Sequence, residues 1–234
     1  MLSMNPSPKP RRRTRLWLVA LLVLALLPLG GVVMTAVLPP APTLLMVGEA
    51  IKGRGLDYRW RSLNDISPNL VNAVIAAEDA RFCEHRGFDI EAIEKALDHN
   101  ARGKRVRGGS TISQQTAKNV FLWPSRDWVR KGLEAGYTVL IETIWGKRRI
   151  VEVYLNVAEW APGVYGAQAA ARHWFDKDAD ALTAREAARL AAILPSPRRY
   201  RAATPGPYVR RRAARIQAAM GTVRNDGLNA CVLG

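Results

Sequence analysis

The sequence predicts a mostly α-helical domain that follows a single N-terminal transmembrane helix. Residues 16–38 form an apolar run without a charged residue, which is long enough to span a bilayer core of about 30 Å. After residue 43, apolar residues recur with helical spacing in segment after segment, and strand-like alternation is scarce. The chain has 234 residues, of which 48% are hydrophobic, so it can build one domain with a real core in addition to the anchor.

The predicted anchor carries a strong charge asymmetry. No acid occurs before Glu49, whereas five basic residues precede the apolar run: Lys9, Arg11, Arg12, Arg13 and Arg15. The positive-inside rule therefore predicts a cytoplasmic N-terminus and an exported domain on the outer face of the cytoplasmic (inner) membrane. A cleavable signal peptide is the alternative, but its apolar core is usually shorter, and TAVLPPAPT is a poor cleavage site. We expect a tail at 1–15, an uncleaved span at 16–38 and a proline-stiffened linker at 39–59.

The charge balance predicts an anionic partner. The formal net charge is +15 and the sequence pI is about 10.6, which suits nucleic acid, phospholipid head groups or a phosphorylated substrate. Residues 196–224 alone hold eight arginines and no acid. Because the domain is expected outside the cytoplasm and no helix-turn-helix motif stands out, we expect no nucleic acid partner. A solvated basic helix near anionic head groups is the expected role of this segment.

The cysteines and histidines do not form a metal-binding pattern. The two cysteines, Cys83 and Cys231, lie far apart in the sequence, and no Cys-x-x-Cys or His-x-x-x-His spacing occurs. We expect two ordinary free thiols, although a disulfide is chemically allowed outside the cytoplasm.

Capping signals place several helices. Ser67-Pro68 is a typical helix start, and the helix is expected to run to about Phe82. Asp89 can cap a second helix, and Thr183 with Glu186 forms a capping box for another. The remaining helices are expected at about 111–120, 127–145, 148–157, 164–174 and 207–221.

One carboxylate interrupts the apolar stripe of the first of these helices. At 100° per residue, Glu78 falls near the centre of a stripe formed by Leu70, Val71, Val74, Ile75 and Phe82. A carboxylate there costs several kcal/mol unless it is paired or neutral. It is therefore either half of a structural ion pair or a carboxyl whose raised pKa suits it to general base catalysis.

A basic segment follows, and it contains a polar loop. Residues 101–131 hold one acid, Asp127, against eight basic residues, and the loop at 108–119 reads GGSTISQQTAKN. Glycines followed by hydroxyl and amide side chains at a helix start can bind anions and sugars. In the next helix Arg130 and Glu134 are four apart, an arrangement that is usually a weak surface pair. Both flank an apolar stripe on the same helix, formed by Val129, Leu133, Tyr137, Leu140 and Ile144, and Glu142 is expected on the opposite, solvated side.

The order of these pieces resembles the peptidoglycan glycosyltransferase family. Glu78-Asp-Ala-Arg-Phe-Cys-Glu-His-Arg-Gly87, RGGSTISQQTAKN at 107–119 and Arg130-Lys131-x-x-Glu134 are similar to three of its motifs. RIVEVYLN at 149–156 and the segment at 163–197 are similar to two more. The similarity favours the monofunctional biosynthetic transglycosylases, because only about 30 residues follow and no Ser-x-x-Lys or Lys-Thr-Gly is present. Cys83 departs from the family, in which an aromatic residue is common at this position.

The resemblance implies a fold and a reaction. It implies an all-α, lysozyme-like, two-lobed glycosyltransferase domain at 60–202, followed by a basic helix and tail at 203–234. The reaction is the polymerisation of lipid II onto the growing glycan strand, with inversion and release of undecaprenyl pyrophosphate. Glu78 would be the general base, and Glu134 would orient Arg130 and Lys118 or hold a divalent cation, Mg or Mn. The implied substrate-binding residues are Asp79, Phe82, His85, Gly109, Ser110, Thr111, Gln114, Gln115, Lys118, Asn119, Arg126, Arg130 and Lys131.

Two other functions are less consistent with these residues. A lysozyme-like hydrolase must activate water and protonate a sugar oxygen, and it has little use for a dense set of cations at the leaving group. A membrane-tethered protein that binds anionic ligands would use the charge without catalysis. Beyond lipid II, the expected partners are membrane lipids and other cell-wall synthesis proteins.

Overall fold

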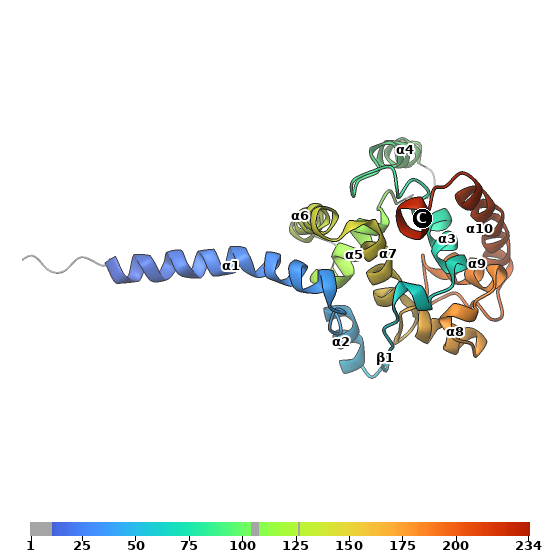
Figure 1. Cartoon of the computed structure of the whole chain (residues 1–234), viewed down its shortest axis with the longest axis horizontal. Coiled ribbons are helices and arrows are strands. Elements are labelled where there is room, and N and C mark those ends of the chain that lie inside the picture. Colours follow the sequence, from blue (N-terminus) through green and yellow to red (C-terminus); the bar gives the residue numbers. More distant parts are fainter. Residues whose placement is uncertain (1–10, 104–107, 126) are drawn as a thin grey trace, which may run out of the picture.

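The computed structural model describes residues 11–103, 108–125 and 127–234, and these are mostly helical (Figure 1). This confirms the predicted all-α class and is consistent with a lysozyme-like domain. The α-helices are α1 (Arg11–Val37), α2 (Leu44–Ile51), α3 (Pro68–Glu78), α4 (Ile90–Ala101), α5 (Ile112–Phe121), α6 (Trp128–Ile144), α7 (Gly146–Val157), α8 (Ala167–Phe175), α9 (Ala184–Ile193), α10 (Pro207–Asn225) and α11 (Ala230–Leu233). Two 3-10 turns lie at Leu63–Asp65 and Ala179–Ala181, and the strands are β1 (Asp57–Tyr58), β2 (Glu159–Ala161) and β3 (Val164–Tyr165).

Helix α1 projects from the body of the molecule, and its C-terminal end is attached to the domain (Figure 1). The indole Nε1 of Trp145 donates to the Val32 carbonyl at 2.8 Å, and Arg149 Nη2 donates to the Thr35 carbonyl at 2.9 Å. Within the described residues, no helix meets the length and apolar character that a membrane crossing requires, so the predicted span at 16–38 is not confirmed.

The stretch at 39–59, expected as a linker, contains α2 and β1. Thr43 caps α2 by accepting from the backbone N–H of Met46, whose side chain is fully buried. At the end of α2, the buried Glu49 pairs with Arg198 at 3.0 Å. Strand β1 pairs in parallel with β3, which pairs antiparallel with β2. This part of the chain is therefore tied to the domain before the first motif begins.

The helices form two packed groups that meet in one continuous core (Figure 1). Helices α3, α9 and α10 pack against one another, and α5 packs against α6 and α7. The four apolar residues predicted for the stripe within α3 are all fully buried: Leu70, Val71, Val74 and Ile75. The carboxyl end of α3 and the start of α5 consequently meet between the two groups.

The capping predictions are confirmed, but α3 is shorter than expected. Ser67, Asp89 and Thr183 each accept from a backbone N–H in the first turn of their helix. Helix α3 ends at Glu78, not near Phe82, because Asp79 leaves the helical conformation at φ −162° and turns its carboxylate toward α5. Phe82 is buried, although it lies in the loop that follows.

The C-terminal segment differs from two expectations. Helix α10 is not simply solvated, because one face is buried against α3 and α9 through Val209, Ala213, Ile216, Met220 and Val223. The cysteines are not free thiols: a disulfide joins Cys83 to Cys231. The reason is tertiary, since α10 and α11 return the chain end to the loop after α3, a proximity that sequence separation hides.

Candidate active site

Glu78 is the last residue of α3 and lies at the junction of the two helix groups. Its side chain is 15% exposed and accepts two hydrogen bonds. Gln115 Nε2 from α5 donates to Oε2 at 3.1 Å, and Arg212 Nη2 from α10 donates to Oε1 at 3.3 Å. Burial raises the pKa of Glu78 above its ordinary value, against the opposing effects of Gln115 and Arg212. Burial is thus the physical cause of the raised pKa that the sequence led us to expect for Glu78.

Gln115 is oriented by a buried tyrosine of α7. The hydroxyl of Tyr154 donates to Gln115 Oε1 at 3.4 Å, which leaves the amide Nε2 to face Glu78. Burial keeps the pKa of Tyr154 well above its usual value, so the hydroxyl stays a donor. A chain of contacts therefore runs from α7 through α5 to α3.

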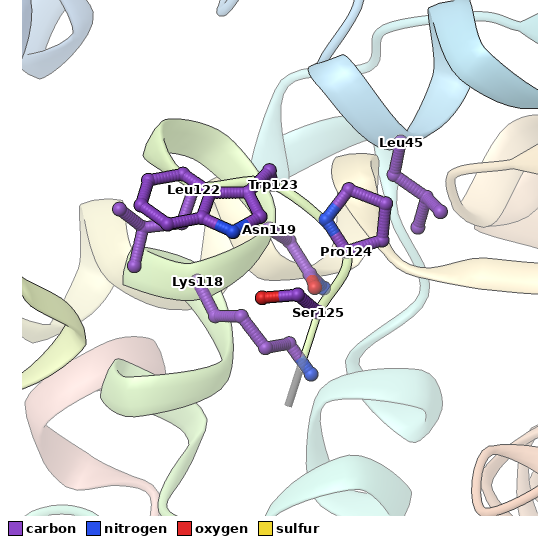
Figure 2. Close-up of a pocket in the computed structure, with 7 residues that line it drawn as sticks. All are labelled: Leu45, Lys118, Asn119, Leu122, Trp123, Pro124 and Ser125. Carbon is purple, nitrogen blue, oxygen red and sulfur yellow. The ribbon is translucent and has the colours of Figure 1, made fainter. Parts of the chain in front are cut away.

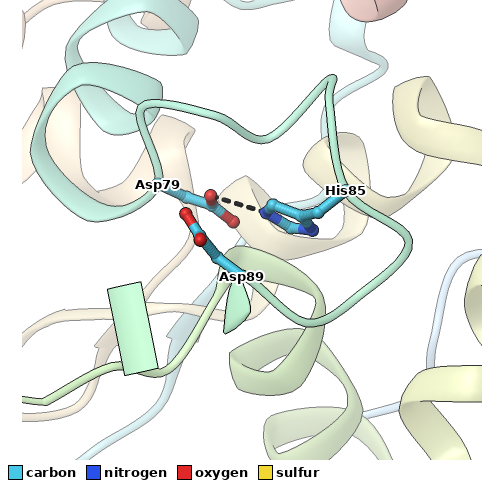
Figure 3. Close-up of side chains that lie close together, drawn as sticks. All are labelled: Asp79, His85 and Asp89. Atoms are coloured by element: carbon cyan, nitrogen blue, oxygen red, sulfur yellow. Dashed lines mark hydrogen bonds and ion pairs between the residues drawn. The ribbon is translucent and has the colours of Figure 1, made fainter. Parts of the chain in front are cut away.

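Asp79, His85 and Asp89 cluster in the loop beside Glu78 (Figure 3). Their possible ligand atoms all lie within 4.8 Å of one another. Each carboxylate is already used by the protein, because Asp79 accepts from the Ile112 N–H at 2.9 Å and pairs with His85 at 2.8 Å. Asp89 accepts from the Ala92 N–H and from Arg81, each at 2.9 Å. In the structure Asp79 and His85 fix the loop to the start of α5, and their contact with substrate stays a prediction.

The polar loop before α5 is divided between folding and binding. Thr111 and Gln114 form a capping box, and the Thr111 hydroxyl also donates to the Gly87 carbonyl at 2.6 Å. Gly109 packs closely on α4, since a Cβ there would lie 3.1 Å from the Ile93 Cα, which is tighter than an ordinary contact. Ser110 is exposed. A pocket of about 380 Å³ joins Ser110 and Thr111 to Glu78.

A second glutamate, Glu134, is surrounded by cations from α5 and α6. Arg130 Nη1 donates to Glu134 Oε2 at 2.7 Å, and Lys131 pairs with Oε1. The Arg130 and Glu134 side chains are 9% and 4% exposed, so this pair is buried and not a surface pair. Lys118 interacts electrostatically with both Glu134 and Glu78, and burial lowers the pKa of its ammonium. Lys118 therefore connects the Glu78 carboxyl electrostatically with the cations around Glu134.

The predicted apolar stripe of helix α6 is only partly covered. Val129 and Leu133 are exposed, whereas the other three stripe residues, Tyr137, Leu140 and Ile144, pack partly buried against the core. The buried residues of α6 are Arg130, Glu134, Thr138 and Ile141. Glu142 is not solvated: its side chain is 8% exposed, pairs with Lys147 at 2.8 Å and accepts from the Ser113 hydroxyl. Glu142 is buried because the loop at Gly87 packs on this face of α6.

Lys118 and Asn119 share a pocket with apolar side chains (Figure 2). The pocket measures about 320 Å³, and Leu45, Leu122, Trp123, Pro124 and Ser125 complete its lining. It can accept a ligand that combines an anionic group with an apolar chain. Arg126, predicted to extend this cationic group, lies outside the described residues.

Glu134 fits poorly as a metal ligand. Both of its oxygens already contact cations, Oε2 with Arg130 and Oε1 with Lys131. A divalent ion bound there would be repelled by the positive charge of both neighbours. The arrangement fits a residue that orients cations.

Sequence reasoning missed two residues at the site, Arg212 and Tyr154. Tyr154 lay within the fourth motif without an assigned role. Arg212 is three residues after Val209 and four before Ile216, both of which are buried. This helical spacing is the signal that could have placed Arg212 on the inward face of α10.

Comparisons with known proteins identify the family of the chain. A model of the transglycosylase family matches residues 47–221. The chain is 57% identical over 223 residues to the biosynthetic peptidoglycan transglycosylase of Caulobacter vibrioides, covering 95% of this chain and 97% of the relative. It is 55% identical over 206 residues to the protein of the same name from Pseudomonas aeruginosa, covering 84% and 89%. The chain therefore belongs to the transglycosylase family, among the monofunctional biosynthetic peptidoglycan transglycosylases.

Proposed function

We propose that this peptidoglycan glycosyltransferase polymerises lipid II into glycan strands and releases undecaprenyl pyrophosphate. The observation that carries the proposal is the pairing of a buried carboxyl, Glu78, with a cluster of cations around Glu134 in one site. Such a site can take a proton from an attacking hydroxyl and also stabilise an anionic leaving group. These are the two demands of glycosyl transfer from a diphosphate.

Glu78 acts as the general base. It takes the proton of the 4-hydroxyl of the acceptor sugar as that oxygen attacks the anomeric carbon of the growing strand, with inversion at this carbon. Burial raises the pKa of Glu78 toward the neutral range in which a base is most effective. Gln115 holds one carboxylate oxygen and thereby fixes the direction from which the base acts.

The cations stabilise the departing diphosphate. Lys118 and Arg130 supply positive charge, and a guanidinium suits bidentate contact with phosphate oxygens. Glu134 holds Arg130 in place at 2.7 Å. Charge neutralisation is the main need of a pyrophosphate leaving group, which requires little protonation. Ser110 and Asn119 supply further polar groups for sugar and phosphate oxygens, and Arg126 joins the cationic group in this proposal.

The family resemblance also suggests that a divalent cation, Mg or Mn, binds at the site. It would add charge neutralisation at the diphosphate. Because Arg130 and Lys131 already contact Glu134, the ligands of this divalent cation are expected to come from the substrate and water. Titrating EDTA against the polymerisation rate tests this dependence.

We also propose that α1 attaches the enzyme to the cytoplasmic membrane, with the catalytic domain outside and next to its lipid-linked substrate. Large apolar side chains of α1 are exposed, among them Leu16, Trp17 and Leu18 at 63%, 71% and 61%. Membrane lipids and other cell-wall synthesis proteins are the partners expected there. Alkaline phosphatase fused to the C-terminus should be active, since it requires export; an inactive fusion together with a functional cytoplasmic reporter at the same site would reverse the orientation.

Polymerisation of labelled lipid II by the purified full chain in detergent tests the reaction. The proposal predicts long glycan products, separable by electrophoresis, and their digestion by added lysozyme. A hydrolase would instead shorten preformed strands and make none. Failure to make polymer in the presence of Mg or Mn would contradict the proposed function.

A further inference from the structure

Elements far apart in the sequence converge on the Glu78 carboxylate. Gln115 comes from α5, Tyr154 acts on Gln115 from α7, and Arg212 comes from α10. Arg212 belongs to the segment at 203–234, which the sequence analysis separated from the glycosyltransferase domain. The proposed reaction assigns no role to Arg212.

The Arg212 side chain reaches the carboxyl end of α3. It is 24% exposed, and its Nη2 lies 3.3 Å from Glu78 Oε1 and 3.5 Å from the Ala77 carbonyl oxygen. Its Nε is buried without a hydrogen-bond partner in the part of the chain that the structure describes. A guanidinium with a buried, unmatched N–H is costly for a merely structural contact. The cost is understandable if the group must point at Glu78.

Helix α10 holds Arg212 in this position. Ala213 and Ile216, next to it on the helix, are buried where α10 packs on α3 and α9. Arg211 and Arg215 on the same helix are exposed. The backbone that carries Arg212 is therefore fixed by apolar packing, and among these three arginines Arg212 is the one directed at the base.

We infer that Arg212 is a positioning residue for the general base: from α10 it holds the Glu78 carboxylate at the end of α3 and keeps it ionised while the acceptor sugar binds. The inference rests on the proposed function, because it assigns Arg212 a role through Glu78. It also makes the C-terminal helix part of the catalytic unit.

The charges that face Glu78 set the direction of the expected effect. Burial and the adjacent Asp79 raise the pKa of Glu78, whereas Gln115 and Arg212, together with Lys118 from α5, lower it. Tyr154 from α7 stays neutral. Removing the positive charge of Arg212 therefore raises the pKa of Glu78, and a larger fraction of the base is protonated at any given pH.

The test is the pH dependence of lipid II polymerisation by Arg212→Gln, Arg212→Lys and the control Arg215→Gln. For Arg212→Gln we expect the acidic limb of the kcat profile to move up by about one pH unit, with KM nearly unchanged. Below the limb this corresponds to a roughly tenfold lower rate. Arg212→Lys keeps the positive charge, so its acidic limb should lie close to that of the wild type. Arg215→Gln should match the wild type.

Each outcome decides the inference. A wild-type acidic limb in a folded Arg212→Gln variant overturns it, as does a loss of rate without a shift; if that variant does not fold, the position of the limb in Arg212→Lys decides in the same way. Glu78→Gln, assayed in parallel, separates the two levels. Activity in Glu78→Gln would overturn the proposed base together with the role of Arg212. An inactive Glu78→Gln variant beside an unshifted Arg212→Gln variant would overturn the role of Arg212 alone.

Discussion

Two glutamates of the same site have opposite surroundings. Glu134 contacts two cations directly, Arg130 at 2.7 Å and Lys131. Glu78 has an amide at 3.1 Å and one guanidinium at 3.3 Å, and its α3 neighbours Val74 and Ile75 are fully buried. The Glu134 side chain is buried, at 4% exposure, and the Glu78 side chain is half-buried, at 15%. The identity of their partners is the larger difference between them.

This difference explains how one residue type can serve two roles. A carboxylate that contacts two cations can hold those cations in place. A carboxylate in apolar surroundings with fewer partners has a raised pKa and can accept a proton near neutral pH. Glu78 is accordingly expected to matter for chemistry and Glu134 for structure and charge.

The largest effect on catalysis is expected from Glu78→Gln. The amide keeps the shape and removes the base, so polymerisation should fall by at least about a hundredfold. Stability should stay level or rise, because a carboxyl with a raised pKa is costly to ionise in the folded state. The stabilisation should be absent near pH 4 and should grow as the pH rises from the unfolded pKa of 4.5 through the folded pKa. Lipid II turnover and urea unfolding at pH 4 and 8 measure both, and retention of more than about a tenth of wild-type turnover would show that the base assignment is wrong.

Glu134→Ala should have the opposite effect on stability and destabilise the fold. It leaves the Arg130 guanidinium buried without its counter-charge, and breaking such a pair costs about 3 kcal/mol of unfolding free energy. Urea denaturation at neutral pH measures the loss, with the exposed Glu94→Ala as the control. If Glu134→Ala were as stable as Glu94→Ala, the Arg130–Glu134 contact would not be the structural pair described here.

The sequence located Glu78 better than it located the residues around it, and the role of Glu78 as the base stays a prediction. Glu78 and its stripe could be found because helical periodicity is local, and Ser67, Asp89 and Thr183 could be assigned because caps are local too. Long-range contacts were hidden. The roles of Asp79 and His85 depend on the start of α5, and the burial of Glu142 depends on a loop more than fifty residues away in sequence.

Helix α6 shows the same limit in a different way. Its apolar stripe was read as the inward face, yet the structure buries Arg130 and Glu134 and exposes Val129. Periodicity separates two faces of a helix without stating which of them is covered. Arg212 was missed because eight arginines in one basic segment looked alike until α10 was placed against α3.

Lys118 offers a smaller test of the cationic side. Lys118→Ala should weaken binding of a phosphoglycolipid inhibitor of the moenomycin type by about 1.5–3 kcal/mol, the cost of one charged hydrogen bond. Arg126→Ala should have a similar effect if it joins the same group. Isothermal titration gives the affinities, and unchanged binding in both variants would remove these residues from the diphosphate site.

Lys118→Arg should produce the smallest effect and separate the two limbs of the pH profile. Burial lowers the pKa of Lys118, so the ammonium loses its charge at a lower pH than an exposed lysine would. A guanidinium stays charged at every accessible pH. The basic limb of the kcat/KM profile, which reports the free enzyme, should therefore extend to higher pH in Lys118→Arg, while the acidic limb set by Glu78 stays in place. Substitution of an exposed lysine, Lys95→Arg, serves as the control. If the basic limb does not move in Lys118→Arg, this limb reports the titration of another group. The contrast between Glu78 and the cations would then depend on the evidence from Glu78 alone.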